Sequence, residues 1–387
     1  VTSIGSTAFR NCTALTQVIM ESATPPTAGT TLFLNSNNLS KILVPTDAAV
    51  TAYKAKAGWS TYKDKIFSID TSSLNFTPIT STGATTTEGS SSHVGYMVGT
   101  GNPTAGNGIK SGKTISSDLY IPATYNGKPV TAIGQYAFSE CKDIKSIIFP
   151  TSITSIGELA FNQCSNLNID ISSIFPKIKS IGTKAFFECT GLKEIILPST
   201  LTTLGENSFN GCTSVTNLKY LGSSITSIGY YTFGWCTKLE KVEWSNLSSI
   251  GAQAFYQCTK LSSINFKPSY VGASAFFKCY ELQSITLASS CKEIGDNAFN
   301  SCTKLATINL GNVQKIGATA FFSCALTKVE LYSLTSIGGT AFKSCPLTAV
   351  YLGSSVNSVG TAFDGCNKIS FCQIRNGTLA VQVASDS

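Results

Sequence analysis

The sequence is short of charge, of histidine and of long apolar runs, and each shortage removes a class of function. Charged residues make up 13% of the 387 residues and carry a net charge of +7. The basic residues are scattered, so no Lys- or Arg-rich block predicts binding to nucleic acid or to a lipid surface. No apolar run approaches the ~20 residues that a membrane-spanning helix needs. We therefore expect no nucleic-acid partner and no insertion of this chain into a membrane.

Residues suited to catalysis or metal binding are equally scarce. His93 is the only histidine and lies in a Ser-rich stretch, where we expect a solvated loop. The 14 cysteines include no Cys-x-x-Cys pair, and a zinc site would need converging ligands. No Gly-rich phosphate loop is present. The sequence therefore predicts no metal and no other cofactor, and it favours a protein that is not an enzyme.

What the chain does have is an internal repeat. The pattern Ile-Gly-x-x-Ala-Phe-x-x-Cys-x-x-Leu-x-x-Ile-x-Leu recurs at steps of 21 to 25 residues, with further copies at Phe9 and Phe33. A period of this length indicates a solenoid, because a single rung can bury its apolar stripe only by stacking on its neighbours. The repeat phenylalanines of the main run are Phe138, Phe161, Phe186, Phe209, Phe233, Phe255, Phe276, Phe299, Phe321, Phe342 and Phe363.

Each part of the repeat predicts a local structure. The Leu-x-x-Ile-x-Leu segment predicts a strand with one buried face, and the Gly predicts either a positive φ or a close approach to the next rung. Ala254, Cys258 and Leu261 are spaced like one face of a short helix. The expected fold is an α/β leucine-rich-repeat solenoid with rungs of about 23 residues, a parallel β-sheet on one flank and short helices or turns on the other.

Residues 133–366 resemble the BspA-like, bacterial-surface-antigen type of leucine-rich repeat. That family's pattern is nearly whole in IGTKAFFECTGLKEIILP, residues 181–198. LYIPATYNGKPVTAIGQYAF and VPTDAAVTAYKAKAGWSTYKDKI resemble the family's first rung and closing unit, and we expect Trp59 and Tyr62 to pack over the end of the array. The resemblance implies adhesion or ligand recognition at a bacterial cell surface, with host matrix proteins or surface glycans as partners.

Three segments are expected along the chain. Residues 1–70 should end a first array, with a closing cap at about 44–66. Residues 71–117 are rich in Ser, Thr and Gly, and they are either a linker or, as we favour, a β-element that covers the first rung of a second array. Residues 118–387 should form that second array of about eleven rungs. Because Val1 lies inside a repeat unit, we expect the natural N-terminus and any targeting signal to lie upstream.

The positions of the cysteines favour a packing role. Twelve of them follow a repeat Phe by three residues, while Cys291 and Cys372 occupy other apolar positions of the repeat. Side chains that point inward in parallel do not make the Cβ approach that a disulfide needs, so unpaired core filling is favoured over one or two disulfides. On this interpretation a Cys258→Ser change buries a hydroxyl without an assured partner.

Binding should therefore depend on side chains that face outward. On the strand flank the candidate residues are Lys219, Lys241, Glu243, Asn265, Lys328, Glu330 and Tyr351. Lys219 and Glu243 are predicted to pair across adjacent strands. The alternative candidates form an aromatic row after the repeat Phe: Phe187, Tyr256, Phe277 and Phe322. The first row is equally compatible with a solubilising face, and the second with a cover over the gap between neighbouring helices.

We expect a monomeric extracellular or cell-surface protein that binds an extracellular protein or polysaccharide through the solenoid face. The alternative is a structural spacer that displays another domain. An enzyme is a distant third, because nothing in the sequence indicates a deep pocket.

Overall fold

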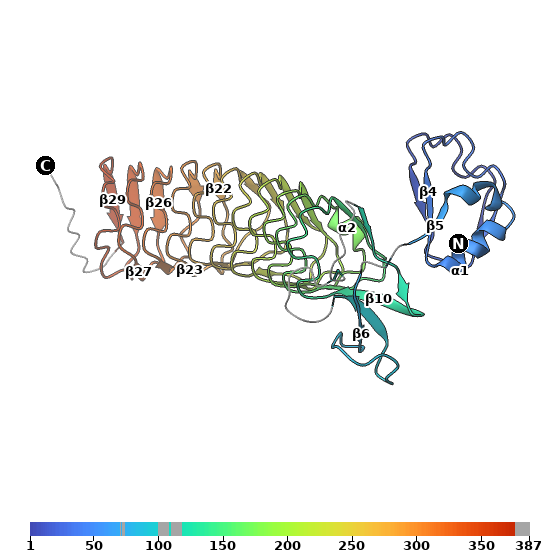
Figure 1. Cartoon of the computed structure of the whole chain (residues 1–387). Coiled ribbons are helices and arrows are strands. Elements are labelled where there is room, and N and C mark those ends of the chain that lie inside the picture. The colour runs from blue at the N-terminus through green and yellow to red at the C-terminus, as the bar shows by residue number, and fades with distance from the viewer. Residues whose placement is uncertain (70, 72–73, 100–107, 110–117, 376–387) are drawn as a thin grey trace.

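The computed structural model describes residues 1–69, 71, 74–99, 108–109 and 118–375. Figure 1 shows a long solenoid of stacked rungs that runs to the C-terminal end, and a smaller N-terminal unit. Nearly all neighbouring strands in the described residues pair in parallel. The predicted fold class, a leucine-rich-repeat solenoid, is therefore confirmed.

The Leu-x-x-Ile-x-Leu segments form what we call the strand flank, in which each strand pairs with its counterpart one rung away. Exposed and buried residues alternate along these strands, so every second side chain projects outward. The strands are β8 (Asp118–Tyr120), β11 (Ser146–Ile148), β14 (Glu194–Leu197), β16 (Asn217–Tyr220), β18 (Lys241–Glu243), β20 (Ser263–Ile264), β22 (Ser284–Ile285), β24 (Thr307–Ile308), β26 (Lys328–Leu331), β28 (Ala349–Leu352) and β29 (Phe371–Ile374).

A second parallel ladder, which the sequence analysis took for a corner, precedes the repeat glycines. A Cβ on Gly205 would lie 2.3 Å from the main-chain nitrogen of Thr183 in the preceding rung, so close approach explains this glycine. The strands of this ladder are β10 (Lys128–Ile133), β12 (Ser155–Ile156), β13 (Ser180–Ile181), β15 (Thr203–Leu204), β17 (Ser227–Ile228), β19 (Ser249–Ile250), β21 (Tyr270–Val271), β23 (Glu293–Ile294), β25 (Lys315–Ile316) and β27 (Ser336–Ile337).

The Phe-x-x-Cys segments form turns, and the predicted short helix is wrong. The main-chain nitrogen of Phe255 donates to the oxygen of Ala275 in the next rung at 2.8 Å, whereas a helix would bond it four residues back. Gln253 and Gln257 have φ values of 58° and 55°, which break any helix at these points. We call the face formed by these stacked turns the turn flank.

Helix is rare in the described part of the chain. Its α-helices are α1 (Asp47–Ala55) and α2 (Ile171–Ile174), and a 3₁₀ segment, η1, covers Ser60–Lys65. None of these helices is long and apolar enough to cross a membrane.

A column of stacked phenylalanines lies at the centre of the solenoid. Ring centroids of successive repeat phenylalanines from Phe138 to Phe363 are 5.0 to 5.8 Å apart, and their planes differ by 3 to 15°. They belong to one hydrophobic core that extends from Leu74 to Cys366. The rungs therefore share a continuous core, as stacking requires.

The N-terminal unit has a core of its own. Its strands are β1 (Ser3–Ile4), β2 (Gln17–Ile19), β3 (Thr27–Ala28), β4 (Lys41–Val44) and β5 (Ile66–Ser68). Trp59 is fully buried there, and Tyr62 packs edge-on against Phe33 with ring centroids 5.1 Å apart. Thr46 begins α1, since its hydroxyl accepts a hydrogen bond from the Ala49 nitrogen at 3.1 Å.

An antiparallel hairpin joins the N-terminal end of the second ladder. It consists of β6 (Phe76–Ile79) and β7 (Gly95–Val98); β7 pairs in parallel with β10, and β9 (Thr124–Tyr125) pairs with the other part of β10. Its loop holds His93, which is buried against Tyr96, so the expectation of a solvated histidine is wrong. Residues 100–107 and 110–117 of this segment lie outside the described residues.

Candidate functional site

The cysteines form a row of hydrogen-bond donors inside the solenoid. In ten rungs the Cys thiol donates to the main-chain oxygen of the repeat Phe one rung earlier, over 3.0 to 3.4 Å. Cys258, for example, donates to Phe233 at 3.2 Å. The repeat pattern does not reveal this bond, and the Phe233 oxygen is an acceptor within reach of position 258 that the expectation for Cys258→Ser did not include.

Burial makes these thiols poor nucleophiles. Loss of solvation raises the pKa of Cys236 to about 12, because the interior disfavours a thiolate. Eleven cysteines are buried, and all 14 are unpaired in the structure. Cys12 and Cys141 are partly exposed and Cys372 is exposed, so the expectation that every cysteine lies in the core is wrong at these ends of the stack.

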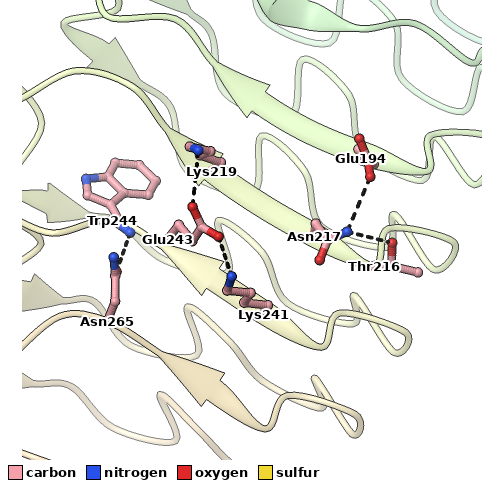
Figure 2. Close-up of polar contacts among 8 residues, drawn as sticks. All are labelled: Glu194, Thr216, Asn217, Lys219, Lys241, Glu243, Trp244 and Asn265. Atoms are coloured by element: carbon pink, nitrogen blue, oxygen red, sulfur yellow. Dashed lines mark hydrogen bonds and ion pairs between the residues drawn. The ribbon is translucent and has the colours of Figure 1, made fainter.

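The strand flank brings one group of candidate residues together on β16 and β18. Lys219 pairs with Glu243 across the two strands at 3.3 Å, as predicted, and Lys241 approaches the other oxygen of Glu243 at 2.5 Å (Figure 2). The hydrogen bonds from Lys241 and Lys219 hold the pKa of Glu243 below its ordinary value. Asn265, on the next rung, accepts a hydrogen bond from the Trp244 nitrogen at 2.6 Å, so it also fixes the end of β18.

A second group lies on β26 and β28, with β20, β22 and β24 between it and the first. Lys328 pairs with Glu330 at 2.6 Å, and its ammonium group lies 4.7 Å from the centre of the Tyr351 ring. The hydrogen bond to Glu330 raises the pKa of Lys328 above its ordinary value. The seven strand-flank residues therefore form two separate polar groups on one face.

The predicted aromatic row is only partly brought together. The rings of Tyr256 and Phe277 stack with centroids 4.9 Å apart and planes 6° apart, while Phe187 and Phe322 lie on more distant rungs. All four side chains are partly exposed. Because the turn flank contains no helices, these rings cover neighbouring turns and not a gap between helices.

The sequence analysis overlooked Trp235, which extends this aromatic row. It is 42% exposed, and its ring lies 5.7 Å from that of Tyr256. Trp235 lies two residues after its repeat Phe, whereas the residues of the predicted row lie one residue after theirs. A search at a single repeat position therefore does not find it.

Trp235 ends a groove of about 710 Å³ on the turn flank. The groove crosses five rungs, starting at Lys142 on the rung of Phe138. Most of its lining residues have polar side chains, but apolar atoms form the larger part of its surface, and Phe187 lies among them. The remaining residues that line it are Gln163, Ser165, Glu188, Thr190, Asn210, Gly211 and Thr213.

Gly211 is one of the residues that line the groove. At the same repeat position the neighbouring rungs carry Glu188 and Trp235. Glu188 reaches over this glycine, since its Cγ lies 2.8 Å from where a Gly211 Cβ would stand. The sequence signal is therefore a glycine between two neighbouring rungs that carry large residues.

Side chains that could bind a metal ion do not gather in the described residues. There, no three His, Cys, Asp or Glu side chains group in a way that would hold a metal ion. The strand-flank carboxylates pair with lysines, and the thiols point into the core. The arrangement is suited to recognition by surface contacts.

Comparison with known proteins places these features in a family. The model of the BspA-type leucine-rich-repeat region matches in six copies, over residues 1–80, 124–240, 168–270, 226–334 and 311–383. No curated protein matches the chain significantly.

Solved structures of bacterial leucine-rich-repeat proteins resemble the chain. A leucine-rich-repeat protein from Bacteroides ovatus is 25% identical with a TM-score of 0.54, over 80% of this chain and 90% of the other. A leucine-rich cell-surface protein from Faecalibacterium prausnitzii is 22% identical with a TM-score of 0.42, over 73% and 91%. The pneumococcal vaccine antigen PcpA is 21% identical with a TM-score of 0.47, over 77% and 83%.

Proposed function

The chain belongs to the BspA-type leucine-rich-repeat family, and from this membership we propose that it is a cell-surface recognition protein. Its proposed partner is an extended extracellular protein that lies along the strand flank, as in bacterial adhesion. The charge-poor composition, in which only 13% of residues are charged, agrees with an extracellular location.

The observation that carries this proposal is the exposed row of charged side chains on the strand flank. The side chains of Lys219, Lys241 and Lys328 are 49%, 54% and 51% exposed, and each one pairs with a glutamate on its own or the adjacent strand. These pairs hold the charges on a rigid ladder while leaving them open to a partner. A solenoid's extended face commonly serves as a binding surface.

The competing function is a spacer that displays another domain. The continuous core from Leu74 to Cys366 favours it, since a shared core makes the array a single stiff body. A spacer needs stiffness but no partner, so a binding experiment separates the two functions.

The experiment compares the whole chain with the triple variant Lys219→Ala, Lys241→Ala and Lys328→Ala against immobilised matrix proteins, with surface polysaccharides in the same panel. We expect micromolar binding to a protein that weakens at least several-fold in the variant and falls with added salt, because exposed charges are screened. The matched control Lys260→Ala, Lys292→Ala and Lys304→Ala removes the same charge from other exposed positions.

Two results would contradict the proposal. Absence of micromolar binding across the panel would favour the spacer. Binding that tolerates the strand-flank changes would show that the partner uses another surface.

A further inference from the structure

We propose that the turn-flank groove between Lys142 and Trp235 binds a short, linear, neutral oligosaccharide. This site goes beyond the proposed protein partner, because it lies on a different flank and shares no residue with the strand-flank groups.

The shape of the groove fits a linear ligand that lies along the solenoid. Successive core rings beneath it, from Phe186 to Phe209 and on to Phe233, are 5.2 and 5.7 Å apart. This spacing is close to the length of one sugar ring in an extended chain, so consecutive sugars could lie over consecutive rungs. Its volume of about 710 Å³ belongs to an open groove, which would contact one side of a ligand lying along it.

Two aromatic rings offer faces to the apolar side of a sugar. Trp235 lines one end of the groove and is packed against Tyr256, which holds its ring in place. Phe187 lines the middle, with the Lys184 ammonium 5.8 Å from the centre of its ring. Exposed aromatic faces of this kind stack on apolar groups, and the C–H face of a sugar is such a group.

The remaining lining provides the hydrogen-bond groups that hydroxyls require. The Gln163 amide donates to Glu188 at 3.0 Å, so the two planar groups lie side by side at the groove. An amide and a carboxylate each have further donor or acceptor positions beyond that one bond. Thr190 and Thr213 add hydroxyls along the groove.

The charge of the groove argues for a neutral ligand. Its charged lining residues are one cation and one anion, Lys142 and Glu188. A phosphate or a sulfated chain would require several cations, and an apolar peptide anchor would require fewer polar groups. A ligand with many hydroxyls and apolar faces matches the lining best.

The position of Gly211 provides a specific blocking variant. Gln163 and Gln257 occupy the same repeat position, with φ values of 58° and 55°, so this left-handed position accepts a glutamine in other rungs. Gly211 has a φ of 78°, and a Cβ there would meet the flexible Glu188 side chain at 2.8 Å, so a side chain at this position carries some strain. Gly211→Gln should therefore fill the groove at a cost in stability, which the thermal midpoint of the variant measures.

Tryptophan fluorescence gives a local readout. Of the three tryptophans, Trp59 and Trp244 are fully buried and Trp235 is exposed. Acrylamide quenching of the whole chain should report mainly on Trp235. The probes are cellotetraose, xylotetraose, mannotetraose, maltotetraose and tetra-N-acetylchitotetraose, each beside its monosaccharide.

We expect at least one tetrasaccharide to protect Trp235 from quenching and to bind at least about ten-fold more tightly than its monosaccharide, because it covers more rungs. Phe187→Ala and Gly211→Gln should weaken that binding about ten-fold or more. The controls Phe322→Ala and Ser323→Gln change the same repeat positions outside the groove and should leave binding unchanged.

Two outcomes would overturn the proposal: no protection by any oligosaccharide in the panel, or equal binding by Gly211→Gln. Circular dichroism of each variant checks that the fold is intact. The triple lysine variant should bind the oligosaccharide normally, and Gly211→Gln should bind the protein partner normally. These two cross-tests distinguish a wrong proposal for the oligosaccharide groove from a wrong proposal for the protein-binding strand flank.

Discussion

The thiol of Cys258 donates a hydrogen bond to the main-chain oxygen of Phe233, in the preceding rung, at 3.2 Å. The same contact recurs through the main array. In most rungs the Phe oxygen also accepts from the Cys main-chain nitrogen of its own rung, as Phe255 does from Cys258 at 3.2 Å, so the thiol adds a second hydrogen bond that links neighbouring rungs. Cysteine suits this position because it packs as a small apolar residue and still carries a donor.

Replacement of Cys258 should separate these two roles. Cys258→Ala leaves a small cavity and a buried carbonyl without its donor, and we expect a loss of about 2–3 kcal/mol in the free energy of unfolding. Cys258→Ser keeps a donor and should cost about 1 kcal/mol less than the alanine variant. Urea unfolding followed by circular dichroism measures both. Cys372→Ser, at an exposed position, is the control and should have little effect; equal losses for Ser and Ala would show that the donor is unimportant.

Thiol reactivity should follow burial. In native protein at pH 8 we expect Cys372 to react first with a disulfide reagent and the eleven buried cysteines to react only after unfolding, because burial raises their pKa and blocks access. Denatured protein should yield 14 free thiols. Cys372→Ser should remove the fast phase. A denatured count of seven or fewer would contradict the packing role of the row.

The two lysines around Glu243 predict a pH effect. Folding lowers the pKa of Glu243 below 4.5. The ionised carboxylate therefore contributes fully to the stability of the fold above the pKa that Glu243 has in the unfolded chain. This contribution to stability is lost as the pH falls through the pKa that Glu243 has in the folded protein. The thermal midpoint should therefore fall on acidification below about pH 4.5, and Glu243→Gln should reduce that fall slightly. The carboxyl NMR signal of Glu243 should titrate at a higher pH in Lys241→Ala. An unchanged titration would show that the pair does not form in solution.

Close contact between rungs predicts that an added methyl group is costly at Gly205. Its Cβ would lie 2.3 Å from the Thr183 nitrogen, which is main chain and cannot rotate away, so Gly205→Ala should destabilise the fold by about 2–3 kcal/mol. Gly311→Ala is the control, because its Cβ would meet the Tyr332 ring at an ordinary 3.7 Å. Similar thermal midpoints for the two variants would contradict this account.

The strands of the strand flank and their register could be predicted because they depend on alternation within one rung, whereas the two-residue strands of the second ladder show no such alternation. Lys219 and Glu243 occupy equivalent positions of adjacent copies, so their pairing follows from the repeat alone. The turn flank could not be predicted in this way. Ala254, Cys258 and Leu261 have helical spacing, but alternate main-chain nitrogens of their segment donate to the next rung, as from Phe255 to Ala275, and the others donate three residues back within the rung.

Of the two candidate binding surfaces, one follows from the repeat within a single rung and the other depends on residues of several rungs. Repeat positions identify which side chains face outward, so the strand-flank residues could be named from the sequence. The groove depends on Gly211 lying between Glu188 and Trp235, which belong to different rungs. Residue size at this repeat position does not single it out, because Ser301, Ser323, Ser344 and Gly365 stand there in other rungs.

The stacked phenylalanine column also determines how the array responds to force. Rung-to-rung hydrogen bonds and ring contacts lie along the solenoid axis, so a pull on the two ends separates neighbours instead of sliding them past each other. Each released rung of about 23 residues would add ~75 Å of extended chain. Under tension applied to its two ends, the array would lengthen in steps and absorb the load, one rung at a time.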